Sequence, residues 1–284
     1  MISMKNILVA IDFSKGSIHA FRYALMLAGQ LGSDISMLWV DNETGIGSGL
    51  SIDDNEYRNE AIRSFNELIS TYSIDFKGEI NYKMRRGKVY QEVSNMAKMN
   101  GAELIIAGTH GVTGFEQYWI GSNAYRIVSY APCPVITVRF DYQFHHDIKN
   151  VVLPIDATPD TRQKIPFACS LTKALGANLH IVGLNSMNLK SMQRKTASNV
   201  EQAVEYCNKE GLEHTVSEIQ SPDVTRAIIN HAISTKADII AIMTEQQRSA
   251  SGLLIGPQAQ QLVNFSPIPV LSIQPKEIYS FTAR

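Results

Sequence analysis

The chain has 284 residues, of which 44% are hydrophobic and 19% are charged, and its formal net charge is -1. This composition is typical of a folded globular protein, and the length suits two ordinary domains. The near-neutral balance excludes a broad basic surface for nucleic acid or for anionic membranes. No apolar run approaches the roughly 18 residues of a membrane span, and the run at residues 7–11 is too short for a signal peptide. We therefore expect a cytoplasmic protein with neither a membrane nor a nucleic-acid partner.

The cysteines argue for a reducing compartment. Cys133, Cys169 and Cys207 are odd in number, widely spaced and without a CxxC pair. A disulfide framework or a zinc ribbon is therefore disfavoured, and reduced thiols are expected.

The sequence repeats itself. KNILVAIDF at 5–13 matches KNVVLPIDA at 149–157, and YAPCPVITV at 130–138 matches FSPIPVLSI at 265–273. The two matches have different offsets, so the second half has lost residues, which we place in the loop after the second strand. The chain is interpreted as a tandem duplication with domains at 1–140 and 148–284, joined near residues 141–149.

Each half alternates apolar strands with amphipathic segments. Short all-apolar runs indicate buried parallel strands, and apolar residues at helical spacing indicate the helices between them. In the first half the predicted strands are 7–11, 35–40, 80–84, 104–107 and 135–138, and the predicted helices are 17–31, 56–72, 89–99 and 122–130. The pattern predicts two doubly wound, Rossmann-like parallel α/β sheets, which bind ligands beyond the carboxyl ends of the strands where strand order reverses.

A glycine-rich segment follows the predicted fourth strand. Gly108, Gly111 and Gly121 precede Ser122 in a Gly-x2-Gly-x9-Gly-Ser pattern, with Gly114 between them. Glycines allow backbone N–H groups to approach an anion, and a helix that opens at this point favours negative charge. Ser122 is a cap for that helix or a hydroxyl donor to phosphate. A set of simple turn formers with an N-cap is the alternative.

These residues, together with IDFS at 11–14 and APCP at 131–134, resemble the universal stress protein family over both halves. The segment differs from a Walker A loop, because no Gly-Lys-Ser/Thr is present, and from the dinucleotide GxGxxG after a first strand. The resemblance implies an adenine nucleotide alpha hydrolase-like fold. It also implies binding of ATP or AMP, with or without Mg²⁺, by a stress-response sensor or regulator rather than an efficient enzyme.

The resemblance also implies which residues of the first half touch the nucleotide. Asp12 would lie near adenine and ribose, Val40 would meet the adenine through its backbone, and the glycine segment would hold ribose and phosphates. The implied set is Ala10, Asp12, Val40, Ala107, Gly108, Gly111, Gly121, Ser122 and Asn123. Position and chemistry independently support only Asp12 and the glycine segment, and Asp12 is equally interpretable as a cap for a helix starting near Ser17.

The second half breaks the glycine pattern. Met243 stands where the first half has Gly108, and Pro257 stands where it has Ser122, although Asp156 is retained. Side chains would occupy the place where backbone must approach phosphate, and proline removes an N–H donor. We predict that this half does not bind ATP in the family's manner and serves as an internal partner, with residues 135–138 and 270–273 pairing into a pseudo-dimer. A further homodimer remains open.

Other functions and features stay as alternatives. No nucleophile–base pair is recognisable, so no catalytic residue is assigned, but a slow Mg-dependent ATPase or phosphotransferase using Asp12 is one rival and a ligand-free scaffold is another. His110 is interpreted as a turn residue rather than a phosphate contact. His145-His146 lacks companions at metal spacing and is interpreted as solvated. The turn at residues 85–88 is either solvated or assists a phosphate.

Overall fold

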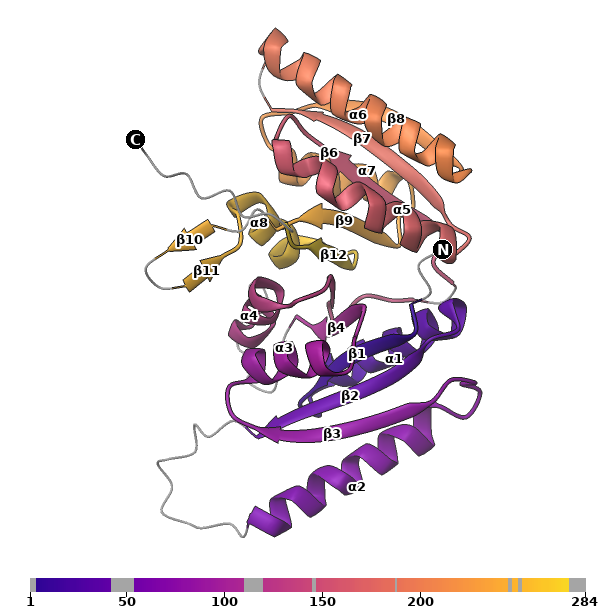
Figure 1. The fold of residues 1–284 in the computed structure, drawn as a ribbon, viewed down its shortest axis with the longest axis vertical. Coiled ribbons are helices and arrows are strands. Elements are labelled where there is room, and N and C mark those ends of the chain that lie inside the picture. The colour runs from indigo at the N-terminus through magenta and orange to yellow at the C-terminus, as the bar shows by residue number, and fades with distance from the viewer. Residues whose placement is uncertain are drawn as a thin grey trace. The chain divides into compact units, whose positions relative to one another are not determined.

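The computed structural model describes residues 4–41, 54–109, 120–144, 147–186, 188–244, 247–249 and 252–275 (Figure 1). They divide into two compact halves, Met4–Asp147 and the described residues from Ile148 onward. Both halves alternate strands and helices, which confirms the predicted tandem α/β class. Among the described residues, no helix is long and apolar enough to cross a membrane.

The first half is built on a parallel sheet with the order β3-β2-β1-β4-β5. Its strands are β1 (Asn6–Ile11), β2 (Asp34–Asp41), β3 (Ile80–Arg86), β4 (Leu104–Gly108) and β5 (Val135–Val138), and its helices are α1 (Lys15–Leu31), α2 (Asp54–Tyr72), α3 (Val89–Met99) and α4 (Ser122–Tyr130). From β1 the chain runs outward to β3 and then returns to β4 on the other side. The strand order therefore reverses between β1 and β4.

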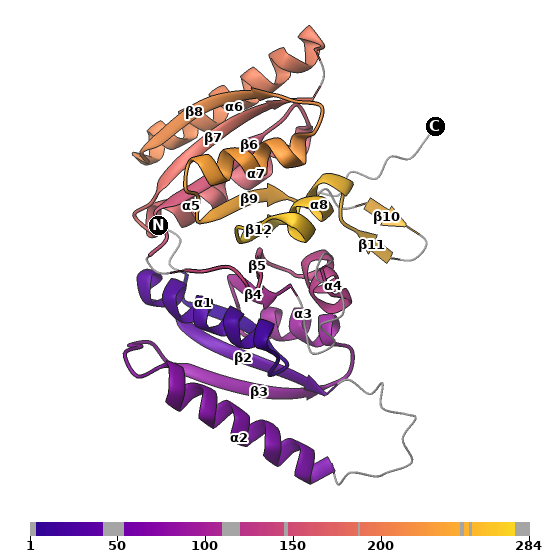
Figure 2. The same cartoon turned by 180° about the vertical axis from the view of Figure 1, so that it is seen from behind.

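The middle of this sheet is fully buried. Ile7 to Val9 on β1 and Leu104 to Ile106 on β4 are all 0% exposed. Figures 1 and 2 show α1 on one face of these strands and α3 and α4 on the other. Cover on both faces explains why the strands read as uninterrupted apolar runs.

Helix α1 begins two residues earlier than the sequence pattern predicts. Its N-cap is Ser14, whose Oγ accepts the N–H of Ser17 at 3.2 Å. The helix ends as predicted at Gly32, which adopts the left-handed conformation with φ 68°. A hydroxyl cap on one side and a left-handed glycine on the other are the usual limits of a helix.

The segment after β5 is part of the first half's packing rather than a bare linker. The ring of Phe144 lies 5.6 Å from that of Tyr23 in an edge contact, and the ring of Tyr142 lies 6.3 Å from the same residue. The Nε2 atom of His19 is 2.8 Å from the carbonyl oxygen of Tyr142. Aromatic contacts of this kind stabilise the segment against α1.

The second half repeats the arrangement with the order β12-β9-β6-β7-β8. Its elements are β6 (Asn150–Ile155), the 3-10 helix η1 (Pro159–Lys164), α5 (Ile165–Ala174), β7 (Asn178–Asn185), α6 (Lys190–Glu210), β8 (His214–Gln220), α7 (Val224–Ser234), β9 (Ile239–Met243), β10 (Gln247–Ser249), β11 (Gly252–Leu254), α8 (Pro257–Phe265) and β12 (Val270–Ile273). Thus β6 takes the place of β1, and β9 takes the place of β4. The sequence pattern did not predict η1 or the β10–β11 hairpin.

Candidate functional site

The predicted site residues of the first half gather at the carboxyl ends of β1, β2 and β4. The parallel register pairs Val9 with Ile106, so the strand ends that follow, at Ala10 and Ala107, lie at the same edge of the sheet. The residues placed at this edge are Ala10 and Asp12 from β1 and the turn after it, Val40 from β2, and Ala107 and Gly108 from β4. Since the strand order reverses between β1 and β4, this edge is where an open α/β sheet forms a ligand crevice.

Gly108 is in close contact with the start of α1. A Cβ atom added to Gly108 would lie 2.7 Å from both the carbonyl carbon and the oxygen of Gly16. Real Cβ atoms do not approach backbone so closely, so only glycine fits while the first turn of α1 crosses the end of β4. Packing is therefore a reason for this glycine in addition to any phosphate contact.

Asp12 is exposed and held in place by the turn that follows it. Its Oδ1 accepts the N–H of Ser14 at 3.0 Å and the hydroxyl of Ser14 at 2.6 Å, while its own N–H donates to Ser17 Oγ at 3.2 Å. The interpretation of Asp12 as the cap of α1 is wrong, because Ser14 is the cap. Oδ2 of Asp12 has no hydrogen bond to any described residue, so one carboxylate oxygen is left for a ligand.

The residue between Asp12 and Ser14 is strained. Phe13 has φ 61°, a conformation that bulky side chains rarely adopt. Its ring meets the edge of Phe65 at 5.0 Å, and Phe65 stacks on Tyr82 at 4.4 Å. Strain of this kind collects at functional sites, where the surroundings enforce it. Sequence reasoning missed Phe13, because nothing in a single sequence marks a positive φ at a phenylalanine.

Helix α4 begins next to β4 without a side-chain cap. Gly121 is its N-cap, with φ -58° and ψ 148°, and its N–H donates to the carbonyl of Thr109 at 2.7 Å. None of the described side chains caps the helix, so the alternative that Ser122 is the cap is wrong. Ser122 is instead the first helical residue and, like Asn123, is exposed. The N–H groups of residues 122–124 have no intrahelical acceptor, and together with the helix dipole they favour an anion.

Other predicted features lie outside the described residues. Gly111, Gly114 and His110 belong to residues 110–119, so their roles stay predictions, and the same holds for the His145-His146 pair. Within the described ranges, no group of three or more His, Cys, Asp or Glu side chains could hold a metal ion.

The turn after β3 is tied to the end of β2. Asp41 Oδ2 lies 3.8 Å from Nε of Arg86, and the carbonyl of Asp41 accepts the N–H of Gly87 at 3.0 Å. Val40, directly before Asp41, is paired in register with Arg85. The side chain of Arg86 is 56% exposed, so this ion pair contributes little to stability. Together with the backbone hydrogen bond it links the end of β2 to the turn after β3, and assistance of this turn to a phosphate remains a prediction.

The second half keeps the same turn but fills the crevice. Asp156 Oδ1 accepts the N–H of Thr158 at 2.9 Å and its hydroxyl at 2.6 Å, as Asp12 does with Ser14. The cavity beside it measures only about 40 Å³ and is lined in part by Leu184 and Met243. Ligand pockets usually measure about 300–1,000 Å³, so this space holds at most a water or two.

The start of α8 has the same backbone geometry as the start of α4, with one donor removed. Gly256 is the N-cap, with φ -57° and ψ 150°, and its N–H donates to the carbonyl of Thr244 at 2.8 Å. The first helical residue is Pro257, which has neither an N–H nor a hydroxyl. The backbone geometry is thus repeated in the second half, while the N–H and the hydroxyl of the first helical residue are absent from it.

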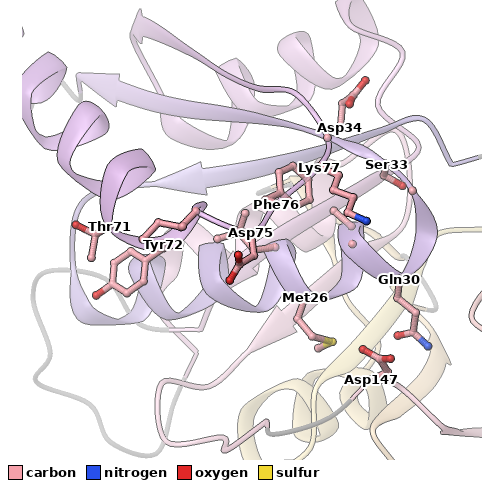
Figure 3. A pocket seen from close by; sticks show the side chains of 16 residues that line it. Met26, Gln30, Ser33, Asp34, Thr71, Tyr72, Asp75, Phe76, Lys77 and Asp147 are labelled. Atoms are coloured by element: carbon pink, nitrogen blue, oxygen red, sulfur yellow. The ribbon is translucent and has the colours of Figure 1, made fainter.

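A surface hollow of about 780 Å³ lies elsewhere in the first half (Figure 3). Met26 and Gln30 of α1, Tyr72 of α2, and the Asp75–Gly78 turn line it. These residues belong to the C-terminal ends of the two helices and to the turn before β3, so the hollow is at the amino edge of the sheet. Open α/β sheets bind their ligands at the opposite edge, and this hollow is therefore not the candidate site.

The comparisons with known proteins agree on one family. The family model described as "Universal stress protein family" matches residues 4–139 and again residues 147–274. The universal stress protein YxiE of Bacillus subtilis is 30% identical over 147 residues, which are 47% of this chain and 98% of that protein. The universal stress protein Slr1230 of Synechocystis is 22% identical over 95% of this chain and 100% of its own length. A crystal structure of a universal stress protein from Archaeoglobus fulgidus has a TM-score of 0.79 at 18% identity, covering 97% of this chain and 100% of that one, which supports the fold.

Proposed function

Because the chain belongs to the universal stress protein family, we propose that its first half binds one adenine nucleotide, ATP or AMP, and that the protein acts as a sensor or regulator in a stress response. The phosphates would lie on the N-terminus of α4, against Gly121, Ser122 and Asn123. The base and ribose would lie toward Asp12 and the end of β2 at Val40. Gly111 completes the set as a prediction from the sequence.

The contrast between α4 and α8 is the observation that carries this proposal. Both helices start at a glycine N-cap that is anchored to the preceding strand end by the same backbone hydrogen bond. If that geometry served packing alone, a proline would be as suitable in α4 as it is in α8. Only the first half has Ser122 at the first helical position, with its N–H and its exposed hydroxyl.

The second half would not take part in binding. The cavity beside Asp156 measures about 40 Å³, which is too small for a base, and α8 begins with Pro257, which lacks the N–H and the hydroxyl that Ser122 offers. We propose that it serves the first half as an internal partner. One nucleotide per chain is the expected stoichiometry.

The site suits a nucleotide that carries its own Mg²⁺. Mg²⁺ is commonly held by substrate phosphates with one or two carboxylates and several waters. Asp12 is a carboxylate of the first half at this edge, and its Oδ2 has no hydrogen bond to a described residue. The same free oxygen keeps a slow Mg-dependent hydrolysis as the second candidate function, and ADP release measured over time in the wild type and in Asp12→Asn separates the two. Equal background release in both proteins excludes the enzyme.

Calorimetric titration of the full chain tests the proposal. ATP, ADP and AMP are titrated separately, with and without Mg²⁺, and the melting temperature is recorded at saturating ligand. We expect one equivalent to bind and the melting temperature to rise, because a ligand that binds only the folded state stabilises it. The absence of both heat and a thermal shift at millimolar nucleotide would leave the ligand-free scaffold as the function.

A further inference from the structure

Two cysteines that are far apart in the sequence lie side by side in the second half. Cys169 on α5 and Cys207 on α6 are separated by 38 residues, yet their Sγ atoms are 3.5 Å apart. Both are free thiols and almost fully buried, at 1% and 0% exposure. The distance is that of van der Waals contact or a weak hydrogen bond. A movement of one sulfur by less than the length of an S–S bond would bring the two atoms to bonding distance.

The two helices hold this arrangement through their packing. The buried face of α6 is a single stripe that ends at Cys207, one turn before the helix stops at Gly211; its members are Thr196, Asn199, Val200, Ala203 and Cys207. One turn beyond each cysteine, Nζ of Lys173 donates to the carbonyl of Glu210 at 2.5 Å and lies 3.5 Å from its carboxylate. The side chains of Lys173 and Glu210 are each 39% exposed. The thiol pair is therefore at the end of a helix, behind a solvent-facing contact, where local opening costs least.

The two sulfurs are chemically different. Either sulfur can donate this hydrogen bond, and with Cys169 as the donor it lowers the pKa of the Cys207 thiol against the opposing effect of burial. The same hydrogen bond raises the pKa of Cys169, and burial raises it further. Cys207 is consequently the first of the two to form a thiolate, which is the nucleophile in thiol oxidation.

We propose that Cys169 and Cys207 form a reversible intramolecular disulfide when the protein meets hydrogen peroxide. The sulfur of Cys207 attacks one peroxide oxygen, the O–O bond breaks, and the leaving hydroxide takes up the thiol proton, so that a sulfenic acid and one water are formed. The sulfur of Cys169 then attacks the sulfenic sulfur, the S–S bond forms, the S–O bond breaks, and the hydroxide leaves with the proton of Cys169 as a second water. The two thiols lose two electrons in total, and hydrogen peroxide accepts them.

The third cysteine gives an internal control. Cys133 belongs to the first half, is half-buried, and has no sulfur partner among the described residues. Burial and the charge of Glu103 raise the pKa of its thiol to about 12, which keeps it protonated. A thiol in that state reacts slowly with peroxide.

Peroxide treatment followed by alkylation in denaturant tests the proposal on the full chain. Reduced protein is exposed to hydrogen peroxide, the remaining thiols are alkylated, and the intact mass and a peptide map are recorded. We expect the wild type to fall from three alkylated thiols to one, with a cross-linked peptide containing Cys169 and Cys207 that dithiothreitol separates. Cys133→Ser should fall from two alkylated thiols to none.

Two variants and three contradicting outcomes make the test decisive. Cys169→Ala and Cys207→Ala should each lose the cross-link while circular dichroism reports an unchanged fold. If one variant fails to fold, the other and the wild-type peptide map still decide. Three alkylated thiols after peroxide, a cross-link that includes Cys133, or a disulfide between two chains on a non-reducing gel would each overturn the proposal.

Discussion

Ser14 binds Asp12 twice, since its N–H donates to Oδ1 over 3.0 Å and its hydroxyl donates to the same oxygen over 2.6 Å. The Oγ of Ser14 also accepts the N–H of Ser17 as the cap of α1. One serine thus fixes the start of a helix and the orientation of the carboxylate that we place beside the nucleotide. Thr158 holds Asp156 in the same way in the second half, where no ligand site is proposed.

Replacing Ser14 should therefore affect both stability and binding. Ser14→Ala removes the N-cap of α1, which costs about 1 kcal/mol, and removes the hydroxyl hydrogen bond to Asp12, while the backbone N–H of residue 14 still donates to Oδ1. We expect urea unfolding at a lower midpoint and an ATP affinity reduced about three-fold, because Asp12 keeps only one of the two hydrogen bonds that orient it. Thr158→Ala is the matched control and should leave ATP affinity unchanged. Equal losses of affinity in both variants would contradict the assignment.

Gly108→Ala tests the contact between β4 and α1. The new Cβ would meet backbone atoms of Gly16 at 2.7 Å, so the strand end or the first turn of α1 must move. We expect a destabilisation of about 1–3 kcal/mol, typical of overpacking, and weaker nucleotide binding.

Gly29→Ala is the control, because Gly29 is an exposed residue within α1 with nothing within 4 Å of its added Cβ. That variant should be as stable as the wild type or slightly more so, by about 0.5–1 kcal/mol. An unchanged unfolding midpoint for Gly108→Ala would show that the crossing is not tight.

A proline exchange between the halves tests the anion site at α4. Ser122→Pro keeps a residue that is well tolerated at the first helical position but removes the N–H and the hydroxyl. We expect ATP affinity to fall about tenfold or more in calorimetry, with a normal circular dichroism spectrum. Pro257→Ser introduces the missing groups into α8, and we expect no second binding event because the crevice beside it measures about 40 Å³. Full affinity in Ser122→Pro would show that the phosphates do not bind at the N-terminus of α4.

Stability should fall in mild acid because three histidines are kept neutral by the fold. Burial lowers the pKa of His19, His180 and His231 below the ordinary value of 6.5, although the carbonyl of Tyr142 opposes the shift at His19. Below pH 6.5 the unfolded chain therefore takes up protons that the folded chain does not, and the free energy of unfolding decreases as the pH falls toward the folded values. Melting temperatures between about pH 7.5 and about pH 5.5 should show this decrease. His19→Gln should make the decrease smaller, and an identical slope would exclude His19 as a contributor.

Much of the local structure could be predicted from the residues in order. The bounds of α3, α4 and β5 agree with the predicted ranges, because helix periodicity, glycine stops and apolar runs depend on neighbours in the sequence. Helix α1 starts two residues before the predicted Ser17, because Ser14 rather than Asp12 is its cap, and only the hydrogen bonds show this.

The sequence by itself determined that the protein is a tandem α/β duplication with a glycine-rich segment in one half only. These properties depend only on the local pattern and spacing of residues. The tertiary structure alone decided which distant residues meet. It brought Gly108 against Gly16, closed the second crevice with Leu184 and Met243, and set two sulfurs on different helices 3.5 Å apart. The physical reason is that these contacts depend on where helices cross and on which strands are neighbours. The spacing of residues along the sequence does not by itself determine which side chains meet there.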